Sequence, residues 1–316
     1  MNLLASMRYL LALSEHRHFA RAAEACHITQ GGLSNAIRSL EEEFKVTIVK
    51  RERTYLGLTP EGEEVLATAQ QMIREQDLLI ERLAADAGQP RGPLRIGAVP
   101  TAMPVLALFA STLKAEYPKI VPVALSMSSP ELEDGLNSLS LDLALGYTDR
   151  IGLAGNDLTA LAQYTERYFL MRRSRSKVAG PLRIGEPVTW TDAAREPMAL
   201  LVRGMHNRTI VDGAFASVGV AIQPAFETNS TLALALSVRA GTVCSVMPGG
   251  LVAAVRDHTG LEACPLVEPD VHTGIGFMAR ASIKASRVTQ AALKFAATPK
   301  WREMVAANSG LLQETE

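Results

Sequence analysis

Residues 19–40 read FARAAEACHITQGGLSNAIRSL, and this stretch decides the fold of the N-terminal part of the chain. Its apolar residues recur at helical spacing in two groups, which are Phe19, Ala22 and Ala23, then Leu33, Ile37 and Leu40. Residues 26–29 separate the two groups as a short turn, and Thr29 ends this turn as a candidate N-cap. Two short helices joined in this way, the first with an Ala pair that permits close packing, predict a helix-turn-helix.

The polar side chains of the second helix point away from its apolar stripe. These are Gln30, Ser34, Asn35 and Arg38. All four can exchange hydrogen bonds with base edges or phosphates, and a recognition helix presents its N-terminal residues to the major groove. The same pattern is also typical of a solvated helix face, so the residues alone leave both interpretations open.

A basic hairpin is predicted directly after this helix. Residues 46–59 alternate at first, then pass through a basic turn into Leu-Gly-Leu-Thr. Lys45, Lys50, Arg51 and Arg53 outnumber Glu52 there, which is typical of a wing that reaches the DNA backbone or minor groove. Residues 1–87 as a whole carry more acidic than basic side chains, so we expect the positive surface to be confined to the wing, Arg21 and Arg38.

A long helix is predicted from residue 60 to about residue 87. Thr59 is a candidate N-cap, Pro60 suits the first helical position, and acidic residues follow in the first turn. The helix carries a wide apolar seam, which includes Leu66, Ala69, Ile73, Ile80 and Leu83. Such a seam needs a partner, either within the chain or in a second copy; we favour dimerisation, because a dimer reads two half-sites together.

The sequence changes character near residue 88. Residues 87–93 (AGQPRGP) form a breaker-rich linker, and short apolar runs then alternate with helical patterns to the end of the chain. The expected strands are 94–99, 120–125, 141–147, 198–202, 242–247 and 274–278, and the expected helices are 103–116, 131–138, 209–217, 231–239 and 283–296. This alternation predicts βαβ units and a largely parallel sheet.

Composition narrows the class of protein. The chain has 316 residues, 47% of them hydrophobic, and a formal net charge of −1, so nucleic-acid binding must come from a local patch. Its cysteines, Cys26, Cys244 and Cys264, are odd in number and far apart, which argues against a disulfide framework or zinc site. No apolar run reaches the ~20 residues that span a bilayer, and the N-terminus lacks a signal-peptide pattern, so we expect a cytoplasmic protein that contacts no membrane.

Catalytic function is the alternative to DNA binding. The sequence contains no nucleophile elbow, phosphate loop, metalloprotease motif or dinucleotide fingerprint, so we expect neither an enzyme nor a bound cofactor. An α/β enzyme or a solute-binding protein remains the alternative for the C-terminal part. Either would leave residues 1–87 unexplained.

The N-terminal motifs resemble those of the LysR-type transcriptional regulators. The resemblance is carried by 7–13 (MRYLLAL), 18–24 (HFARAAE), 28–30 (ITQ), 33–41 (LSNAIRSLE) and 58–62 (LTPEG), in that order and spacing. Weaker matches follow at 94–97 (LRIG), 141–146 (LDLALG), 240–241 (AG) and 246–248 (VMP).

This resemblance implies a fold of class α plus α/β. It implies a winged helix-turn-helix (residues 1–59), a dimerising linker helix (60–88) and a periplasmic-binding-protein-like effector domain (89–316). The effector domain would have two α/β lobes joined by two crossovers, one of about 91–165 with 270–316 and the other of 166–269. The implied partners are an interrupted palindrome in double-stranded DNA, a small-molecule inducer and RNA polymerase, and the implied assembly is a homodimer or homotetramer.

The resemblance also assigns residues, with two departures. Gln30, Ser34 and Asn35 would meet bases, and Arg53 would belong to the wing. The family usually has Pro-Ala where this chain has Gly31-Gly32, and it often has Arg where Asn35 stands. Two glycines cost up to ~1 kcal/mol each in a helix relative to alanine, and asparagine favours adenine over guanine. The full DNA-contacting set that we predict is Arg21, Gln30, Gly31, Ser34, Asn35, Arg38, Lys50, Arg51 and Arg53.

The effector site is predicted at strand ends of the α/β part. Ligands of open α/β sheets bind beyond the carboxyl ends of strands, often on helix N-termini. Thr101 is a candidate N-cap after the first strand, the hydroxyls of Ser128 and Ser129 follow the second, and Arg203 would suit a carboxylate inducer. A plain cap or a surface charge are the simpler alternatives. The predicted set is Thr101, Ala102, Ser128, Ser129, Arg203, His206, Asn207 and Thr228.

Overall fold

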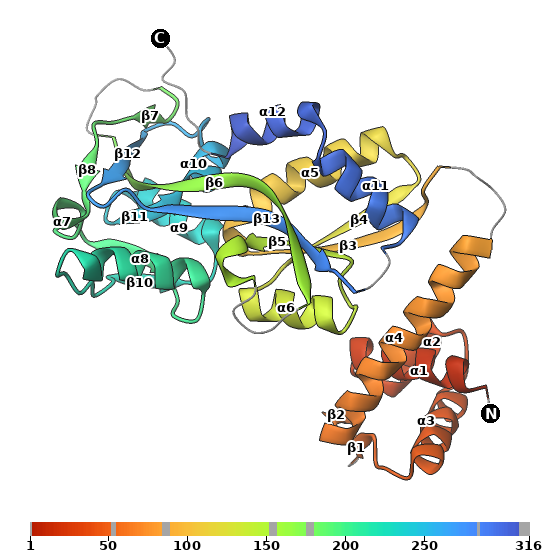
Figure 1. Ribbon diagram of the computed structural model, residues 1–316. Coiled ribbons are helices and arrows are strands. Elements are labelled where there is room, and N and C mark those ends of the chain that lie inside the picture. The colour runs from red at the N-terminus through yellow and green to blue at the C-terminus, as the bar shows by residue number, and fades with distance from the viewer. Residues whose placement is uncertain are drawn as a thin grey trace. The chain divides into compact units, whose positions relative to one another are not determined.

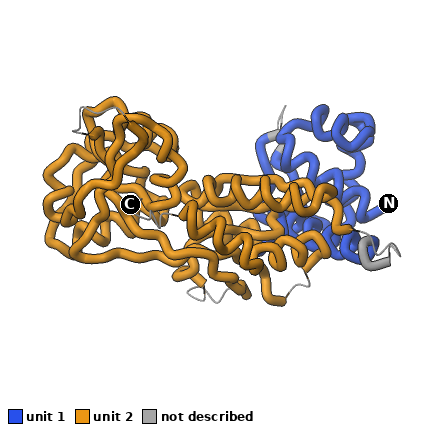
Figure 2. The backbone as a smooth tube through the Cα atoms, turned by 90° about the horizontal axis from the view of Figure 1, so that it is seen from above, with its two compact units in different colours: residues 1–88, 137–140 blue, residues 89–136, 141–316 orange. Residues whose placement is uncertain are grey.

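The structure is a computed structural model that describes residues 2–51, 55–83, 89–151, 157–174, 180–282 and 285–309. The chain divides into two compact units, residues 1–88 with 137–140 and residues 89–136 with 141–316 (Figure 2). Each unit buries apolar cores of its own. The two are therefore described separately.

The first unit is a helical bundle with a two-stranded ribbon. Its elements are α1 (Leu3–His16), α2 (Phe19–Ala25), α3 (Gln30–Phe44), β1 (Val49–Arg51), β2 (Tyr55–Leu58) and α4 (Pro60–Leu83). Leu33, Ile37 and Leu40 of α3 are fully buried, and they pack with Ala22 and Ala23 of α2 as the periodicity predicts. β1 and β2 pair antiparallel, which confirms the predicted winged helix-turn-helix.

The start of α4 is fixed against the chain segment that leads into the wing. The Thr59 hydroxyl accepts a hydrogen bond from the Gly62 amide at 2.9 Å and donates one to the Thr47 carbonyl. A Cβ atom on Gly62 would lie only 2.1 Å from the Ile48 carbonyl oxygen. Glycine is therefore required at this position for the close approach, and Thr59 is the N-cap that the sequence predicts.

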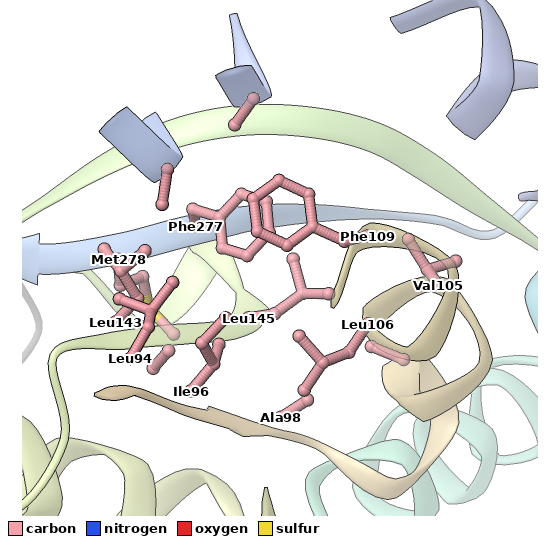
Figure 3. Close-up of a cluster of buried hydrophobic side chains, with 14 of the residues drawn as sticks. Leu94, Ile96, Ala98, Val105, Leu106, Phe109, Leu143, Leu145, Phe277 and Met278 are labelled. Carbon is pink, nitrogen blue, oxygen red and sulfur yellow. The ribbon is translucent and has the colours of Figure 1, made fainter. Parts of the chain in front are cut away.

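The second unit contains two α/β lobes. We call the first one lobe 1. It comprises β3 (Gly92–Ala98), α5 (Met103–Glu116), β4 (Ile120–Ser126), α6 (Ser129–Asn137), β5 (Leu143–Tyr147), α11 (Arg287–Ala296) and α12 (Pro299–Asn308), with short 3-10 turns η1 (Pro100–Ala102) and η2 (Thr148–Arg150). β3 pairs parallel with β4 and β5. Leu94, Ile96 and Ala98 of β3 face the core around Phe109, whose ring centroid lies 4.5 Å from that of Phe277 (Figure 3).

Lobe 2 is one continuous stretch of chain. Its elements are β7 (Arg183–Ile184), β8 (Val188–Thr189), α7 (Trp190–Ala193), β9 (Met198–Leu201), α8 (His206–Ser217), β10 (Phe226–Thr228), α9 (Thr231–Ala240), β11 (Cys244–Pro248), α10 (Gly249–Ala254) and β12 (Leu261–Val267). β9 pairs parallel with β10 and β11. One apolar cluster contains Trp190 and Phe215, and a second contains Leu234 and Leu251, so both faces of this sheet are covered.

Two long strands connect the lobes. β6 (Leu158–Arg173) pairs with β13 (His272–Arg280) over its first half and with β11 and β12 over its second half. The two strands run side by side from one lobe into the other (Figure 1). Their pairing shifts register at Ile275/Gly276, where a Cβ on Gly276 would lie 2.9 Å from the Leu161 carbonyl oxygen. We call the paired crossover strands β6 and β13 the hinge.

The predicted fold class is confirmed, with two corrections to the sheet. The prediction of a largely parallel sheet is wrong at the centre, because β6 and β13 run antiparallel to each other and to their neighbours. The expected strands also omit β6, together with the shorter strands β7, β8, β10 and β12. Helix α5 spans the predicted residues 103–116, whereas α11 begins at Arg287, after an N-cap at Ser286, rather than at residue 283.

Candidate functional site

The exposed face of α3 carries the predicted DNA-reading residues. Thr29 caps the helix by accepting a hydrogen bond from the Gly32 amide at 3.1 Å. Gln30, Asn35 and Arg38 are exposed, and Ser34 is half-buried, while the apolar stripe of the same helix faces the core. The structure thus brings these four polar residues together on one accessible helix face.

The remaining predicted DNA contacts surround this helix in the same unit. Arg21 on α2, Gly31 in the first turn of α3 and Lys50 on β1 are all exposed. A Cβ on Gly31 would meet no atom within 4 Å, so nothing in the fold requires glycine there. Arg51 is the last residue of β1, and Arg53 lies outside the described residues.

Glu41 is a residue of the DNA-reading unit that the sequence patterns do not single out. Its carboxylate, on α3, accepts hydrogen bonds from the Ile48 and Val49 amides at 3.0 and 3.2 Å. Glu41 therefore ties the base of the wing to the recognition helix. In the sequence, Glu41 is the first of three consecutive glutamates, Glu41–Glu43, and such a run is typical of a solvated acidic surface. Nothing in that pattern indicates the contact with the wing.

A small pocket lies between the two lobes of the second unit. Its lining residues come from η1, the start of α6 and the end of β5 in lobe 1, and from the end of β9 and the start of α8 in lobe 2. They are Val99, Pro100, Thr101, Ser128, Ser129, Tyr147, Leu201, Met205, His206 and Asn207. The cavity measures about 10 Å³, which is room for the centre of roughly one water molecule. Five of the predicted effector residues meet here, although they come from three separate stretches of sequence.

Hydrogen bonding inside the pocket is incomplete. The prediction that Thr101 is an N-cap is wrong, because Thr101 lies inside η1 and its hydroxyl lies 3.0 Å from the Tyr147 phenol instead of capping a helix. The Ser128 amide and hydroxyl both donate to Glu131, which lowers the pKa of that carboxyl. Ser129 Oγ and Asn207 Nδ2, by contrast, are buried and have no hydrogen-bond partner. The Asn207 side chain lowers the pKa of Tyr147, but its Nδ2 lies outside hydrogen-bonding geometry. Two polar atoms from opposite lobes are therefore available to a ligand.

Helix termini reinforce these polar groups. Ser129 is the first residue of α6 and His206 the first residue of α8, so the N-termini of both helices lie at the pocket. Partial positive charge at helix N-termini favours anions. Burial is the main reason that the pKa of the Tyr147 phenol lies far above its ordinary value, with the charge of Glu166 second, so the phenol stays protonated.

His206 joins the lobes at the pocket. Its ring lies 4.7 Å from the Tyr147 ring, centroid to centroid, and its Nε2 lies 3.2 Å from an Asp149 carboxylate oxygen. Tyr147 and Asp149 belong to lobe 1, whereas His206 belongs to lobe 2. The sequence patterns miss both lobe 1 residues, because a tyrosine at the end of a buried strand carries no motif.

Arg208 holds α8 in place next to the pocket. Its guanidinium is buried and bonds to the Leu201 carbonyl at 2.7 Å, to Asp212 at 2.7 Å and to Glu227 at 2.6 Å. These bonds tie the first turn of α8 to the ends of β9 and β10. Because Asn207 precedes Arg208 directly, this network orients the pocket face of the helix.

Three predicted effector residues do not line this pocket. Arg203 is exposed and does not belong to the lining, so the structure does not bring the predicted carboxylate-binding guanidinium to the site. Ala102 is fully buried and is not part of the lining, and the Thr228 hydroxyl accepts a hydrogen bond from the Ser230 amide at 3.1 Å. The prediction rested on positions at strand ends, and that criterion does not distinguish residues that line the pocket from residues that do not.

Neither a metal cluster nor a membrane helix is present in the described part of the chain. Within those ranges, no group of three or more His, Cys, Asp or Glu side chains is arranged to hold a metal ion. Among the helices whose residues are described, none is long and apolar enough to cross a bilayer.

Sequence comparisons match both parts of the chain. The family described as "LysR substrate binding domain" matches residues 87–298, and "Bacterial regulatory helix-turn-helix protein, lysR family" matches residues 4–63. The "DNA-binding transcriptional dual regulator OxyR" of Escherichia coli (strain K12) is 29% identical over 280 residues, 87% of this chain and 88% of the relative. A "Hydrogen peroxide-inducible genes activator" of Pectobacterium carotovorum is 29% identical over 280 residues, 87% of this chain and 89% of the relative.

Solved structures share the fold. A full-length OxyR variant from Pseudomonas aeruginosa has a TM-score of 0.71 at 24% identity, covering 92% of this chain and 96% of that one. Full-length CbnR, complexed with its target DNA, has a TM-score of 0.66 at 19% identity, covering 92% and 97%.

Proposed function

The chain belongs to the LysR family of bacterial transcription regulators, and from this we propose that it controls a promoter in response to a small anionic effector held between its two lobes. The observation that carries the effector proposal is the pair of unpartnered polar atoms, Ser129 Oγ and Asn207 Nδ2. Buried polar groups without partners cost about 1–3 kcal/mol each, so a ligand that bonds both would stabilise the closed cleft.

A carboxylate suits this pocket best. It accepts hydrogen bonds only, and the Ser129 hydroxyl, the Asn207 amide and the amides of two helix N-termini are all donors. These donors would bind a carboxylate without Arg203. The small volume favours a compact effector, or one that enters as the lobes separate.

DNA recognition would use two copies of the chain. Met72, Leu79 and Ile80 of α4 are 38%, 48% and 58% exposed, which supports pairing through this helix in a homodimer or homotetramer. Two recognition helices related by a twofold axis would read an interrupted palindrome. Contact with RNA polymerase and a location in the cytoplasm, where the promoter is, belong to the same proposal.

The DNA-binding part is tested with the DNA upstream of the chain's own gene. Fluorescence anisotropy at two salt concentrations should show specific binding that weakens as salt rises. Arg38→Ala should weaken binding by roughly 10-fold, while the control Arg195→Ala, an exposed arginine of the other unit, should not. Equal affinity of both variants and wild type would contradict the proposed reading face.

The effector part is tested by ligand-induced thermal stabilisation with a panel of small carboxylates. Asn207→Ala and Ser129→Ala should each abolish the stabilisation by a carboxylate that binds wild type. Asn229→Ala, an exposed asparagine outside the pocket, serves as the control. A carboxylate that stabilises all three variants equally would place the effector elsewhere.

Peroxide is a second candidate signal, because the names of several relatives refer to hydrogen peroxide. A thiol sensor needs an accessible thiolate. Cys244 and Cys264 are buried, and burial raises the pKa of the Cys26 thiol. We therefore expect that brief peroxide treatment leaves promoter affinity unchanged; a change that the Cys26→Ser variant abolishes would reverse this preference.

A further inference from the structure

Glu166 occupies the middle of the hinge. It lies on β6 between the half that pairs with lobe 1 and the half that pairs with lobe 2, and it stands opposite Thr273 of β13. Its side chain is fully buried. A carboxyl group at such a place is unusual, because ionised groups are almost never fully buried without a partner.

The strand register puts Glu166 on the pocket side of the hinge sheet. Tyr147 of β5 stands opposite Ile275 of β13, which in turn stands opposite Tyr164 of β6. Directly opposed residues, and residues two apart along a strand, point to the same face of a sheet. Tyr147, Tyr164 and Glu166 therefore share one face, and Tyr147 lines the effector pocket.

No cationic side chain pairs with this carboxyl in the described part of the chain. The Tyr164 phenol donates to Glu166 Oε1 at 3.5 Å, whereas Oε2 has no hydrogen-bond partner. The titratable groups on this face are the phenols of Tyr147, Tyr164 and Tyr168 and, beyond Tyr147, Asp149 with its partner His206. In the described part of the chain, Glu166 forms no ion pair with a lysine, arginine or histidine. Burial raises its pKa to about 8, so the carboxyl is protonated at neutral pH.

We propose that Glu166 is a specificity-determining residue of the effector pocket: its protonated carboxyl admits an anion to the cleft, and its ionised carboxylate excludes one. This inference rests on the effector pocket proposed above. The field of the carboxylate reaches the pocket, since the Glu166 charge raises the pKa of the Tyr147 phenol, second only to burial. An anion bound beside Tyr147 would meet the same repulsion.

The proposed coupling between anion binding and protonation of Glu166 can be measured from the pH dependence of binding. If the anion binds only to the protonated form, binding stabilises the proton on Glu166, and affinity falls as pH rises above the pKa of the free protein. Near pH 9 about one molecule in eleven would retain the proton, so affinity would be roughly 10-fold lower than near pH 7. A neutral ligand of the same shape would not share this dependence.

The test uses the full-length protein and two matched probes, acetate and its neutral analogue acetamide. Saturation-transfer NMR titrations near pH 7 and near pH 9 are run on wild type, Glu166→Gln and Asn207→Ala. For wild type, acetate affinity should fall about 10-fold between the two pH values, and acetamide affinity should stay constant. Glu166→Gln should bind acetate equally at both pH values, because glutamine keeps the shape and does not titrate.

Each outcome decides a different point. Acetate binding that Asn207→Ala abolishes but that is independent of pH would overturn the role of Glu166 and leave the pocket intact. The same pH dependence in Glu166→Gln as in wild type would assign the titration to another group and also overturn the proposal. Acetate that binds neither at pH 7 nor at pH 9 would overturn the anion pocket itself, and this inference with it.

Discussion

Gly62 offers the sharpest stability prediction at the scale of single residues. A methyl group there would overlap the Ile48 carbonyl, so α4 and the base of the wing would have to separate. Gly62→Ala should destabilise the first unit by about 1–3 kcal/mol, the usual cost of overpacking. Urea unfolding followed by circular dichroism measures this.

Gly31→Ala is the matched control. Its new methyl group would meet no atom within 4 Å, so the substitution should stabilise α3 by up to ~1 kcal/mol. Opposite signs for the two variants would support the packing argument. If both variants stabilised the protein, the contact between Gly62 and Ile48 would not be as tight as described.

Glu166 predicts how stability depends on pH. Its pKa is about 8 in the folded chain against 4.5 as the ordinary value, so between these values the folded state keeps a proton that the unfolded state releases. Relative to Glu166→Gln, wild type should therefore lose ~1.4 kcal/mol of stability per pH unit across this window, with little change below or above it. The free energy of unfolding of wild type and of Glu166→Gln, measured near pH 5.5 and near pH 7.5, checks this prediction. If the difference between the two proteins is the same at both pH values, the pKa of Glu166 in the folded state is ordinary.

Residue predictions from sequence succeed where a local rule exists. Thr29 and Thr59 are N-caps, as predicted from a threonine directly before a helix, whereas Thr101 is not, because a 3-10 turn that starts at Pro100 includes it. Thr101, Ser129 and Asn207 meet in the pocket because strand ends in an α/β fold converge. Tyr147 and Glu166 could not be found this way, since their importance comes from register across three strands.

Among the elements, the wing depends on a single carboxylate of α3. Glu41→Ala would leave the Ile48 and Val49 amides without this acceptor, at a cost of about 1–3 kcal/mol. Hydrogen exchange of these two amides should accelerate by roughly 10- to 100-fold, and promoter affinity should fall with it. Glu41→Gln keeps an acceptor oxygen and should behave nearly as wild type; equal exchange in the two variants would exclude the proposed anchor.

The apolar seam of α4 has two functions, which periodicity alone could not distinguish. Leu66, Ala69 and Ile73 are buried within the first unit, in the same core as α1 and α3. Leu79 and Ile80, one to two turns later, remain exposed. The intramolecular partner thus covers Leu66, Ala69 and Ile73, whereas the exposed residues Met72, Leu79 and Ile80 support pairing with another copy.

Strand β6 explains why the sheet is incompletely predicted. Its residues include Ala, Leu, Gln, Glu and Arg, which favour helices, and its exposure pattern changes along its length as it passes between lobes. Tertiary pairing with β13, β11 and β12 overrides this local preference. The helices α5 and α9, whose periodicity and boundaries agree, are predicted closely.

At the scale of the whole molecule, assembly is the first property to measure. Ile80→Glu places a charge in the exposed half of the α4 seam and should shift the protein towards monomers in light scattering. Gln71→Glu adds the same charge at another exposed α4 position and should leave the mass unchanged. An unchanged mass for Ile80→Glu would locate the contact between copies elsewhere.

The path of the chain through the hinge has a practical consequence. All of lobe 2, from β7 to β12, is inserted between β6 and β13, so it enters and leaves lobe 1 through two adjacent antiparallel strands. A chimera that exchanges this cassette with a related regulator would need only two junctions, one in β6 and one in β13, where the two strands pair. Each chimera would exchange the pocket residues of one lobe and keep those of the other. Comparing the inducer specificity of the chimera with that of its two parents would show which lobe determines that specificity.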